Sequence, residues 1–328
     1  MPAKKRKVKS GYSHGQKNVG KIVACVFIEI IVISTLIIMT CWNKGVKDWF
    51  AQFGQPVLKE VDISGINSPY AVLMQARGGK ILGEINGEER IYPASMTKIM
   101  TVIVAIENID DLEEKITLTD EMFAGLYEQD ATQAGFQPGE EVRVIDLLYG
   151  AMLPSGAECC IALADTIAGS EEAYAELMNK KAAKLGMDNT HFCDTTGLHD
   201  PDHYSTAKDI AVLLKYCIQN NTFREIAESS RHSTGITNIH PDGITYYSTM
   251  FKNLSDPTVT GGKILGGKTG YTNEAGHCLA SFAEIEGREY ILVTAGAVGT
   301  DGNTIPHIQD AVTVYNRVGE AIKAKMND

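Results

Sequence analysis

Strand-forming patterns occupy two stretches near opposite ends of this 328-residue chain, and this arrangement constrains the fold more than any other feature. Residues 70–91 and 232–297 have the alternation and the Gly and Pro turns of strands. Residues 97–228 are dominated by helical periodicity, and 308–325 predict an amphipathic helix. We therefore expect an α+β fold, in which an antiparallel sheet built from both ends of the chain is flanked by helices, with a helical block inserted between its strands.

Three short motifs follow one another within this framework. They are Ser-Met-Thr-Lys at 95–98, Ser-Gly-Ala at 155–157 and Lys-Thr-Gly at 268–270. Each is weak alone, because short patterns of this kind occur by chance in many proteins. Together they predict a serine nucleophile with a lysine base and a second cation, which is the equipment of an enzyme that forms an acyl-serine intermediate.

The first motif lies at the start of a long apolar run that follows Pro93 and is long enough for a buried helix. Ser95 is expected near the unpaired N–H groups of that helix, with Lys98 three residues on and on the same face. Taken alone, the motif favours the simpler interpretation of a capping serine and a solvated lysine. A base must be neutral, and both burial and a nearby cation lower a lysine pKa from its usual value of about 10.4.

The third motif supplies that cation as Lys268. Residues 263–271 predict a Gly-rich strand, and glycines in a strand allow a ligand backbone to approach closely. An extended peptide then pairs along the strand edge. Ser155 lies in a Pro-Ser-Gly break between two predicted helices, which is usually only a turn. Its functional interpretation is a hydroxyl that relays a proton between Lys98 and a leaving amine.

These motifs and three further segments, 186–192, 196–201 and 203–209, give the chain a clear resemblance. It resembles the serine-type D-alanyl-D-alanine carboxypeptidases, the low-molecular-mass penicillin-binding proteins of peptidase family S11, from about residue 70 to about residue 297. The resemblance implies a β-lactamase/transpeptidase-like fold and removal of the terminal D-alanine from peptidoglycan stem pentapeptides. It also implies that β-lactams acylate the nucleophile as substrate mimics, and that no metal or other cofactor takes part.

The resemblance assigns roles to the matching positions. The catalytic and substrate-binding residues that it implies are Ser95, Lys98, Ser155, Lys268, Thr269, Gly270 and Tyr271. Ser95 is the nucleophile, Lys98 takes its proton, and Ser155 relays a proton to the leaving D-alanine. Lys268 and Thr269 hold the substrate carboxylate. The oxyanion hole is formed by the backbone N–H groups of Ser95 and of the residue that follows the Lys-Thr-Gly motif.

Ala157 departs from the family pattern. The second motif of the family usually ends in asparagine, whose amide orients the substrate and contacts the lysine, and alanine does neither. Water, a neighbouring side chain or backbone are the available substitutes. Two alternatives to a carboxypeptidase therefore stay open. One is a membrane-anchored, non-catalytic penicillin-binding sensor, and the other is a β-lactamase-like hydrolase, although no Glu-x-x-Leu-Asn signature for a deacylating base is found.

The amino terminus predicts where the protein works. Residues 1–21 contain seven Lys or Arg and no acid, and 22–42 are apolar apart from Glu29 and a few small polar residues. About 20 apolar residues span a bilayer, and the basic flank stays in the cytoplasm. We expect a cytoplasmic tail, a transmembrane signal-anchor, a juxtamembrane stalk at 43–62 and an extracellular catalytic domain at 63–328. A cleaved signal peptide is the alternative. The net charge of −11 argues against nucleic-acid binding.

A zinc enzyme is the remaining class to weigh. His199 and His203 are four residues apart, but Pro201 disfavours a helix between them, so the spacing does not place both imidazoles on one face. No His-Glu-x-x-His motif is present. We therefore interpret this segment as a structural loop, in which Asp200 and His203 order the chain beside the site.

Five of the seven cysteines follow the predicted anchor, and an odd number cannot all pair within one chain. Cys159 and Cys160 are expected to pack as small hydrophobes on an apolar helix. A disulfide from Cys193 to Cys217 or Cys278 is left open by the spacing.

Overall fold

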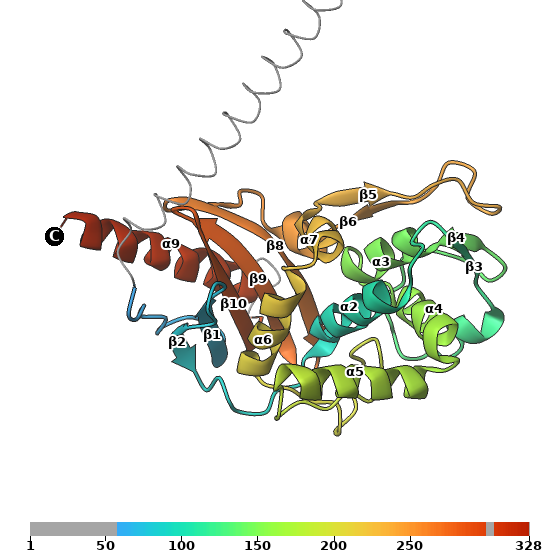
Figure 1. Ribbon diagram of the computed structural model, residues 1–328, viewed down its shortest axis with the longest axis horizontal. Coiled ribbons are helices and arrows are strands. Elements are labelled where there is room, and N and C mark those ends of the chain that lie inside the picture. The colour runs from blue at the N-terminus through green and yellow to red at the C-terminus, as the bar shows by residue number, and fades with distance from the viewer. Residues whose placement is uncertain (1–57, 300–304, 328) are drawn as a thin grey trace, which may run out of the picture. The chain divides into compact units, whose positions relative to one another are not determined.

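The computed structural model describes residues 58–299 and 305–327. Its central element is a six-stranded antiparallel sheet in the order β2-β1-β10-β9-β8-β7 (Figure 1). The strands are β1 Tyr70–Gln75, β2 Ile81–Ile85, β7 Thr258–Val259, β8 Gly262–Thr272, β9 Gly276–Ile285 and β10 Arg288–Ala297. Because β1 pairs with β10 over all six of its residues, the predicted sheet built from both ends of the chain is confirmed.

The sheet is covered on both faces. In β10, Ile291 and Val293 pack with the helical block, whereas Tyr290 and Leu292 pack with the carboxy-terminal helix α9 (Pro306–Asn327). Successive side chains of a strand point to opposite faces, so a strand covered on both faces is a continuous apolar run. Figure 1 shows α9 along one side of the sheet and the remaining long helices on the other.

The helical block is organised around α2 (Lys98–Asn108). Its first eight residues, Lys98 to Ala105, are all buried, so the helix has no solvent-facing stripe there. The helices packed around it are α3 Val144–Met152, α4 Ala157–Ala168, α5 Glu171–Leu185, α6 Ala207–Cys217 and α7 Asn221–Glu228. The predicted buried helix after Pro93 and the predicted inserted block are therefore both confirmed.

Polar residues directly before their first turns determine where several of these helices begin. The side chains of Ser170, Thr206 and Asn220 accept backbone N–H groups at the starts of α5, α6 and α7. Such caps satisfy amide groups that have no partner within the helix, and each stabilises the helix by about 1 kcal/mol. The smaller elements are η1 Ala94–Thr97, η2 Asp120–Phe123, the β3–β4 pair Lys115–Thr117 and Glu141–Arg143, the β5–β6 pair Arg231–Ser233 and Thr245–Tyr247, and α8 Thr249–Asn253.

A buried carboxylate fastens α9 to the segment that precedes β1. Asp310 is 1% exposed, and its Oδ1 accepts the backbone N–H of Asn67 at 2.9 Å and the side-chain amide of Asn67 at 2.7 Å. Its Oδ2 accepts the backbone N–H of Ser68 at 2.9 Å and the Ser68 hydroxyl at 2.6 Å. The carboxylate therefore satisfies four donors at once, on the face of the sheet that α9 covers.

The predicted tail at 1–21 and span at 22–42 lie outside the described residues, as does most of the predicted stalk. Leu58 and Val61, at the end of that stalk, are buried in the core that α9 covers. Among residues 58–299 and 305–327, no helix is long and apolar enough to cross a membrane.

All five cysteines in the described part of the chain are free thiols. Cys159 and Cys160 are fully buried in the helical core, as expected of small hydrophobes. Burial raises the pKa of Cys160 and of Cys278 to about 12, so both stay protonated and apolar at neutral pH.

Candidate active site

The nucleophile candidate Ser95 lies in the short turn η1, directly before the buried helix α2. Ala94 before it has a φ of +47°, a left-handed conformation that costs a non-glycine residue roughly 1–3 kcal/mol. Lys98 is the first residue of α2, is 3% exposed and donates from Nζ to Ser95 Oγ over 3.2 Å. The predicted contact between these two side chains is present, on a backbone held in place by a rigid helix.

The second candidate hydroxyl is held in the same way by the second lysine. Ser155 lies between α3 and α4, is buried and has a φ of +74°, the second strained residue of the site. Lys268 Nζ donates to Ser155 Oγ over 3.0 Å and to the Thr269 carbonyl over 2.9 Å. This contact ties the turn before α4 to β8, so the second and third motifs meet.

Gly270 brings β8 against the nucleophile turn. A Cβ added at this residue would lie 3.1 Å from Ser95 N and 3.1 Å from the Pro93 carbonyl oxygen, closer than nearly all real contacts. Any larger side chain would therefore push the two backbones apart by a few tenths of an ångström. With glycine here, the backbone N of Ser95 lies beside the Lys-Thr-Gly strand, and the oxyanion hole formed by Ser95 and Tyr271 stays a prediction.

Thr269 and Tyr271 have different surroundings. The Thr269 hydroxyl lies 2.6 Å from the hydroxyl of Thr249, the first residue of α8. Tyr271 is 57% exposed, its ring lies 4.7 Å from the ring of His277, and its hydroxyl donates to Asn273 over 3.2 Å. Thr249 was not predicted, because it has no motif of its own and only the packing of α8 on β8 brings it to the site.

One edge of β8 is open along most of the strand. β7 pairs only with Gly262 and Lys263, at the start of β8. From residue 264 to residue 272, β8 pairs with β9 alone among the described strands. The Lys-Thr-Gly motif therefore lies in the part of β8 that has no second strand beside it among the described strands, the kind of edge to which an extended peptide pairs.

The electrostatic consequence of bringing two lysines together falls on Lys268. Burial and the positive charge of Lys98 hold the pKa of Lys268 well below its usual range. A buried cation of this kind is typical of functional sites, because burying its charge lowers the stability of the folded chain. That Lys98 is the lysine that acts as a neutral base stays a prediction.

Ala157 is buried at the start of α4, and its backbone N–H donates to the Thr132 carbonyl over 2.8 Å. Glu158 beside it is fully buried, and burial raises its pKa even though Oε1 accepts the N–H groups of Ala134 at 2.6 Å and Gly135 at 2.9 Å. This acid therefore anchors the 132–135 loop against the Ser155 turn. Neither residue supplies the amide that the family pattern has at position 157.

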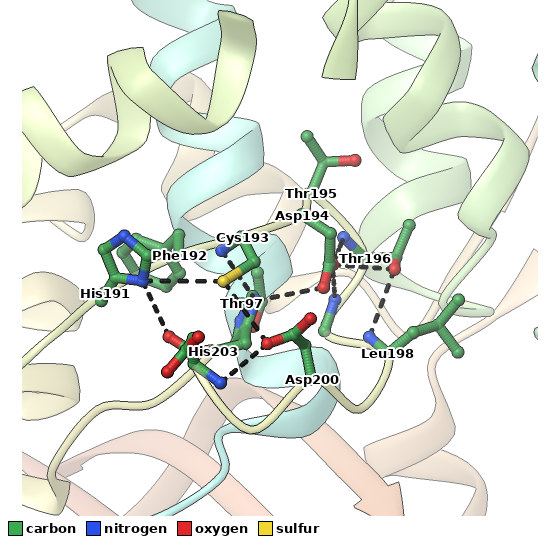
Figure 2. A network of polar contacts seen from close by, with 12 residues as sticks. Thr97, His191, Phe192, Cys193, Asp194, Thr195, Thr196, Leu198, Asp200 and His203 are labelled. Atoms are coloured by element: carbon green, nitrogen blue, oxygen red, sulfur yellow. Dashed lines mark hydrogen bonds and ion pairs between the residues drawn. The ribbon is translucent and has the colours of Figure 1, made fainter. Parts of the chain in front are cut away.

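A loop from another part of the chain contacts the lysine instead. Lys98 Nζ donates to the Thr196 carbonyl over 2.6 Å, a shorter contact than that to Ser95. Asp194 and His203 support this loop in a polar network with Thr97 (Figure 2). The prediction that His203 orders the chain beside the site is confirmed. The role of Asp194 was missed, because nothing in its spacing marks it.

The two histidines weighed as zinc ligands have separate partners. His199 packs edge-on against Tyr92 with ring centroids 4.7 Å apart, whereas His203 is buried against Thr97. In the described part of the chain, no three His, Cys, Asp or Glu side chains are grouped so as to hold a metal ion.

Comparison with known proteins agrees with this geometry. The family model for D-alanyl-D-alanine carboxypeptidase matches residues 58–299. The D-alanyl-D-alanine carboxypeptidase DacF of Bacillus subtilis (strain 168) is 36% identical over 231 residues, covering 69% of this chain and 57% of the relative. DacC of Escherichia coli (strain K12), also a D-alanyl-D-alanine carboxypeptidase, is 39% identical over 171 residues, covering 49% and 42%.

Solved structures give the same result for the fold. The DD-transpeptidase of Streptomyces K15 matches with a TM-score of 0.70 and 28% identity, covering 80% of this chain and 100% of that one. The predicted β-lactamase/transpeptidase-like fold is therefore confirmed. The chain spans about half the length of these two curated relatives, at 57% and 42%.

Proposed function

We propose that this chain, which belongs to the D-alanyl-D-alanine carboxypeptidase family, is an active serine D,D-carboxypeptidase that removes the terminal D-alanine from peptidoglycan stem pentapeptides. One observation carries the proposal. Two hydroxyl–lysine pairs, Ser95–Lys98 at 3.2 Å and Ser155–Lys268 at 3.0 Å, meet at the Lys-Thr-Gly part of β8. A nucleophile with its base and a second hydroxyl with its cation are what acyl transfer from a peptide requires.

Substrate binding begins at the open edge of β8, where the stem peptide adds as a strand. Lys268 and Thr269 receive the terminal carboxylate. The pKa of Lys268 is depressed by burial and by Lys98 in the free protein, and an anion placed beside Lys268 restores its positive charge. The site therefore selects for a substrate that ends in a free carboxylate, at the position where the leaving D-alanine has one.

Acylation follows from the Ser95–Lys98 pair. Ser95 Oγ forms a bond to the carbonyl carbon of the penultimate D-alanine while its proton passes to a neutral Lys98 amine. The backbone N–H groups of Ser95 and Tyr271 stabilise the oxyanion. The C–N bond to the terminal D-alanine then breaks, and the proton held by Lys98 passes through the Ser155 hydroxyl to the leaving amine. Water hydrolyses the ester and restores the hydroxyl. A β-lactam ring enters the same first step and acylates Ser95.

The proposal includes a location. Residues 22–42 anchor the chain as a single span with residues 1–21 in the cytoplasm, which places the catalytic domain outside the cell with its substrate. Support comes from the basic flank and apolar run alone. Carbonate extraction tests the anchor, and protease digestion of intact cells tests the orientation. Release of the chain by carbonate, or a protected catalytic domain, would contradict this part of the proposal.

The test of the activity is D-alanine release from a stem pentapeptide by the full-length protein in detergent, with Ser95→Ala as the control. Release that depends on Ser95 supports the carboxypeptidase. A wild-type protein that is acylated by penicillin yet releases no D-alanine would favour the sensor instead. Rapid release of hydrolysed penicillin would favour the β-lactamase-like hydrolase.

A further inference from the structure

The position of the Lys98 amine depends on a carbonyl group outside the three sequence motifs. Within the described residues, the Lys98 Nζ contacts are Ser95 Oγ at 3.2 Å and the Thr196 carbonyl oxygen at 2.6 Å. Lys98 is 3% exposed, so water has little access to it. With alanine at 157, no side-chain amide from the second motif contacts this group. The carbonyl of Thr196 therefore sets where the lysine lies relative to the nucleophile.

Asp194 fixes that carbonyl. Its Oδ1 accepts three donors of the same tight turn: Thr196 N at 2.7 Å, Thr196 Oγ1 at 2.9 Å and Gly197 N at 2.6 Å. Gly197 has a φ of +80°, and a Cβ there would lie 1.9 Å from the Ala94 carbonyl oxygen. The turn is thus packed without clearance against the residue that precedes the nucleophile, and one carboxylate oxygen determines its shape.

The other oxygen of Asp194 reaches the nucleophile segment through His203. His203 Nδ1 lies 3.1 Å from Asp194 Oδ2, and its Nε2 lies 2.8 Å from the hydroxyl of Thr97. The same Nδ1 also lies 3.2 Å from the backbone N of Cys193, so both ring nitrogens have polar partners, Asp194 and Cys193 on one side and Thr97 on the other. The ring is 2% exposed and packs edge-on against Phe192, with ring centroids 5.5 Å apart, so it has no freedom to turn away.

Thr97 is not used as a helix cap. It is the residue before α2, but its side chain makes no capping hydrogen bond. Its hydroxyl faces His203, as Figure 2 shows for the network around Asp194. The middle of the Ser-x-x-Lys motif and the carbonyl that receives Lys98 are thereby tied to the same carboxylate.

We propose that Asp194 and His203 are positioning residues that hold Lys98 in place from both sides, through Thr97 on its own segment and through the Thr196 carbonyl on the facing turn. The inference rests on the proposed acyl-transfer function. It explains how the lysine is oriented in a chain whose second motif ends in Ala157.

The charge of Asp194 agrees with this role. Burial acts to raise the pKa of Asp194, but the hydrogen bond and the charge of His203 and the N–H groups of Gly197 and Thr196 outweigh burial, so the pKa is lowered. The group is therefore a carboxylate at neutral pH and accepts all of these donors.

The test measures the rate of Ser95 acylation by a fluorescent penicillin in the full-length protein, with the saturating rate separated from the concentration that gives half of it. Asp194→Ala and Thr97→Val remove one link each. We expect the saturating rate to fall by about 10- to 100-fold in both, because a misplacement near 1 Å costs about that much. The half-saturating concentration should change by less than about threefold, since neither residue contacts the substrate.

Two control variants separate positioning from folding. Asp202→Ala removes a carboxylate of the same loop, whose exposed side chain contacts neither Lys98 nor the 194–197 turn. It should stay within about threefold of the wild type. Thr97→Ser restores the hydroxyl and should regain most of the rate lost in Thr97→Val.

Three results would overturn the proposal. The first is acylation at the wild-type rate in folded Asp194→Ala and Thr97→Val. The second is an equal loss in Asp202→Ala. The third is a Thr97→Ser variant no faster than Thr97→Val. D-alanine release, followed in parallel, reports on the proposed function separately: its absence in a wild-type protein that is acylated would contradict carboxypeptidase activity and leave the comparison of rates intact. A wild-type protein that is not acylated would overturn both.

Discussion

Asp310 and Asp194 each accept several hydrogen bonds, but they lie in different parts of the fold and their contacts have different consequences. Asp310 satisfies four donors between α9 and residues 67–68, on the far face of the sheet. Asp194 satisfies three donors of one turn and pairs with His203, beside Ser95 and Lys98. Both shape the chain around a buried or half-buried charge. The first determines only how firmly two segments hold together, whereas the second determines where a reacting amine lies. A structural carboxylate such as Asp194 affects function because one of the residues it holds, Thr196, contacts Lys98.

The largest loss of activity is expected on substitution of Lys98, the residue that Asp194 is proposed to position. Lys98→Ala removes the proposed base, and general bases contribute about 10²- to 10⁴-fold, so we expect a loss of about 10³-fold in penicillin acylation. Stopped-flow fluorescence gives the rate, and the melting temperature should not fall. A variant that is acylated within about tenfold of the wild-type rate would place the base elsewhere.

Lys268→Met separates function from stability at one residue. Release of D-alanine should be lost, because the carboxylate loses its cation and Ser155 loses its donor. In the folded state, burial and the charge of Lys98 lower the pKa of Lys268. In the unfolded state its pKa is about 10.4, so in the pH range between the two values the unfolded chain binds more protons than the folded chain. Stability of the wild type therefore rises with pH across this window and is least below it.

The measurement for this variant is the melting temperature as a function of pH. Lys268→Met should melt above the wild type at pH 7, and the difference should shrink as the pH approaches 10. A variant that melts below the wild type at pH 7, or a difference independent of pH, would show that Lys268 is not a destabilising buried cation.

Asp310→Ala tests the structural end of the comparison. Four donors lose their acceptor, and buried unsatisfied groups cost about 1–3 kcal/mol, so the melting temperature should fall by about 3–10 °C. Acylation of Ser95 at 25 °C should stay within about threefold, because nothing in the site touches this carboxylate. Glu320→Ala, at an exposed position of α9, is the matched control and should change little. A large rate loss in folded Asp310→Ala would break the comparison.

The smallest effect is expected at Ala157. If the Thr196 carbonyl already positions Lys98, Ala157→Asn restores the family pattern with little gain, and D-alanine release should change by less than about fivefold. Steady-state kinetics on the pentapeptide measure this. A gain of about 100-fold or more would mean that the missing amide limits turnover and that the loop does not replace it.

Sequence reasoning reached the sheet, the inserted helices and the meeting of the three motifs, because each rests on a local or periodic signal. The run from Lys98 to Ala105 is apolar enough to require a buried helix, and Gly270 in a strand marks a close approach. It did not reach Thr249 or Asp194. Their importance depends on contacts 20 and 96 residues away along the chain, Thr249 with Thr269 and Asp194, through the Thr196 carbonyl, with Lys98. No propensity or spacing encodes such contacts.

The role of Ala157 could be stated from the sequence only as a loss. The sequence lists what the residue cannot do, while the compensation lies in the backbone carbonyl of Thr196, a group that every residue has and no motif distinguishes. His203 was found in part, because its spacing from His199 drew attention to this loop, but its partner Thr97 was not identified in advance.

The measurement that tests the central claim most directly is D-alanine release by the full-length protein from a stem pentapeptide that ends in two D-alanines, beside Ser95→Ala. We expect one D-alanine for each pentapeptide consumed by the wild type, and none from the variant. Equal release by both proteins would show that Ser95 is not the nucleophile. No release by a folded wild-type protein that penicillin acylates would contradict the account of this chain as a carboxypeptidase.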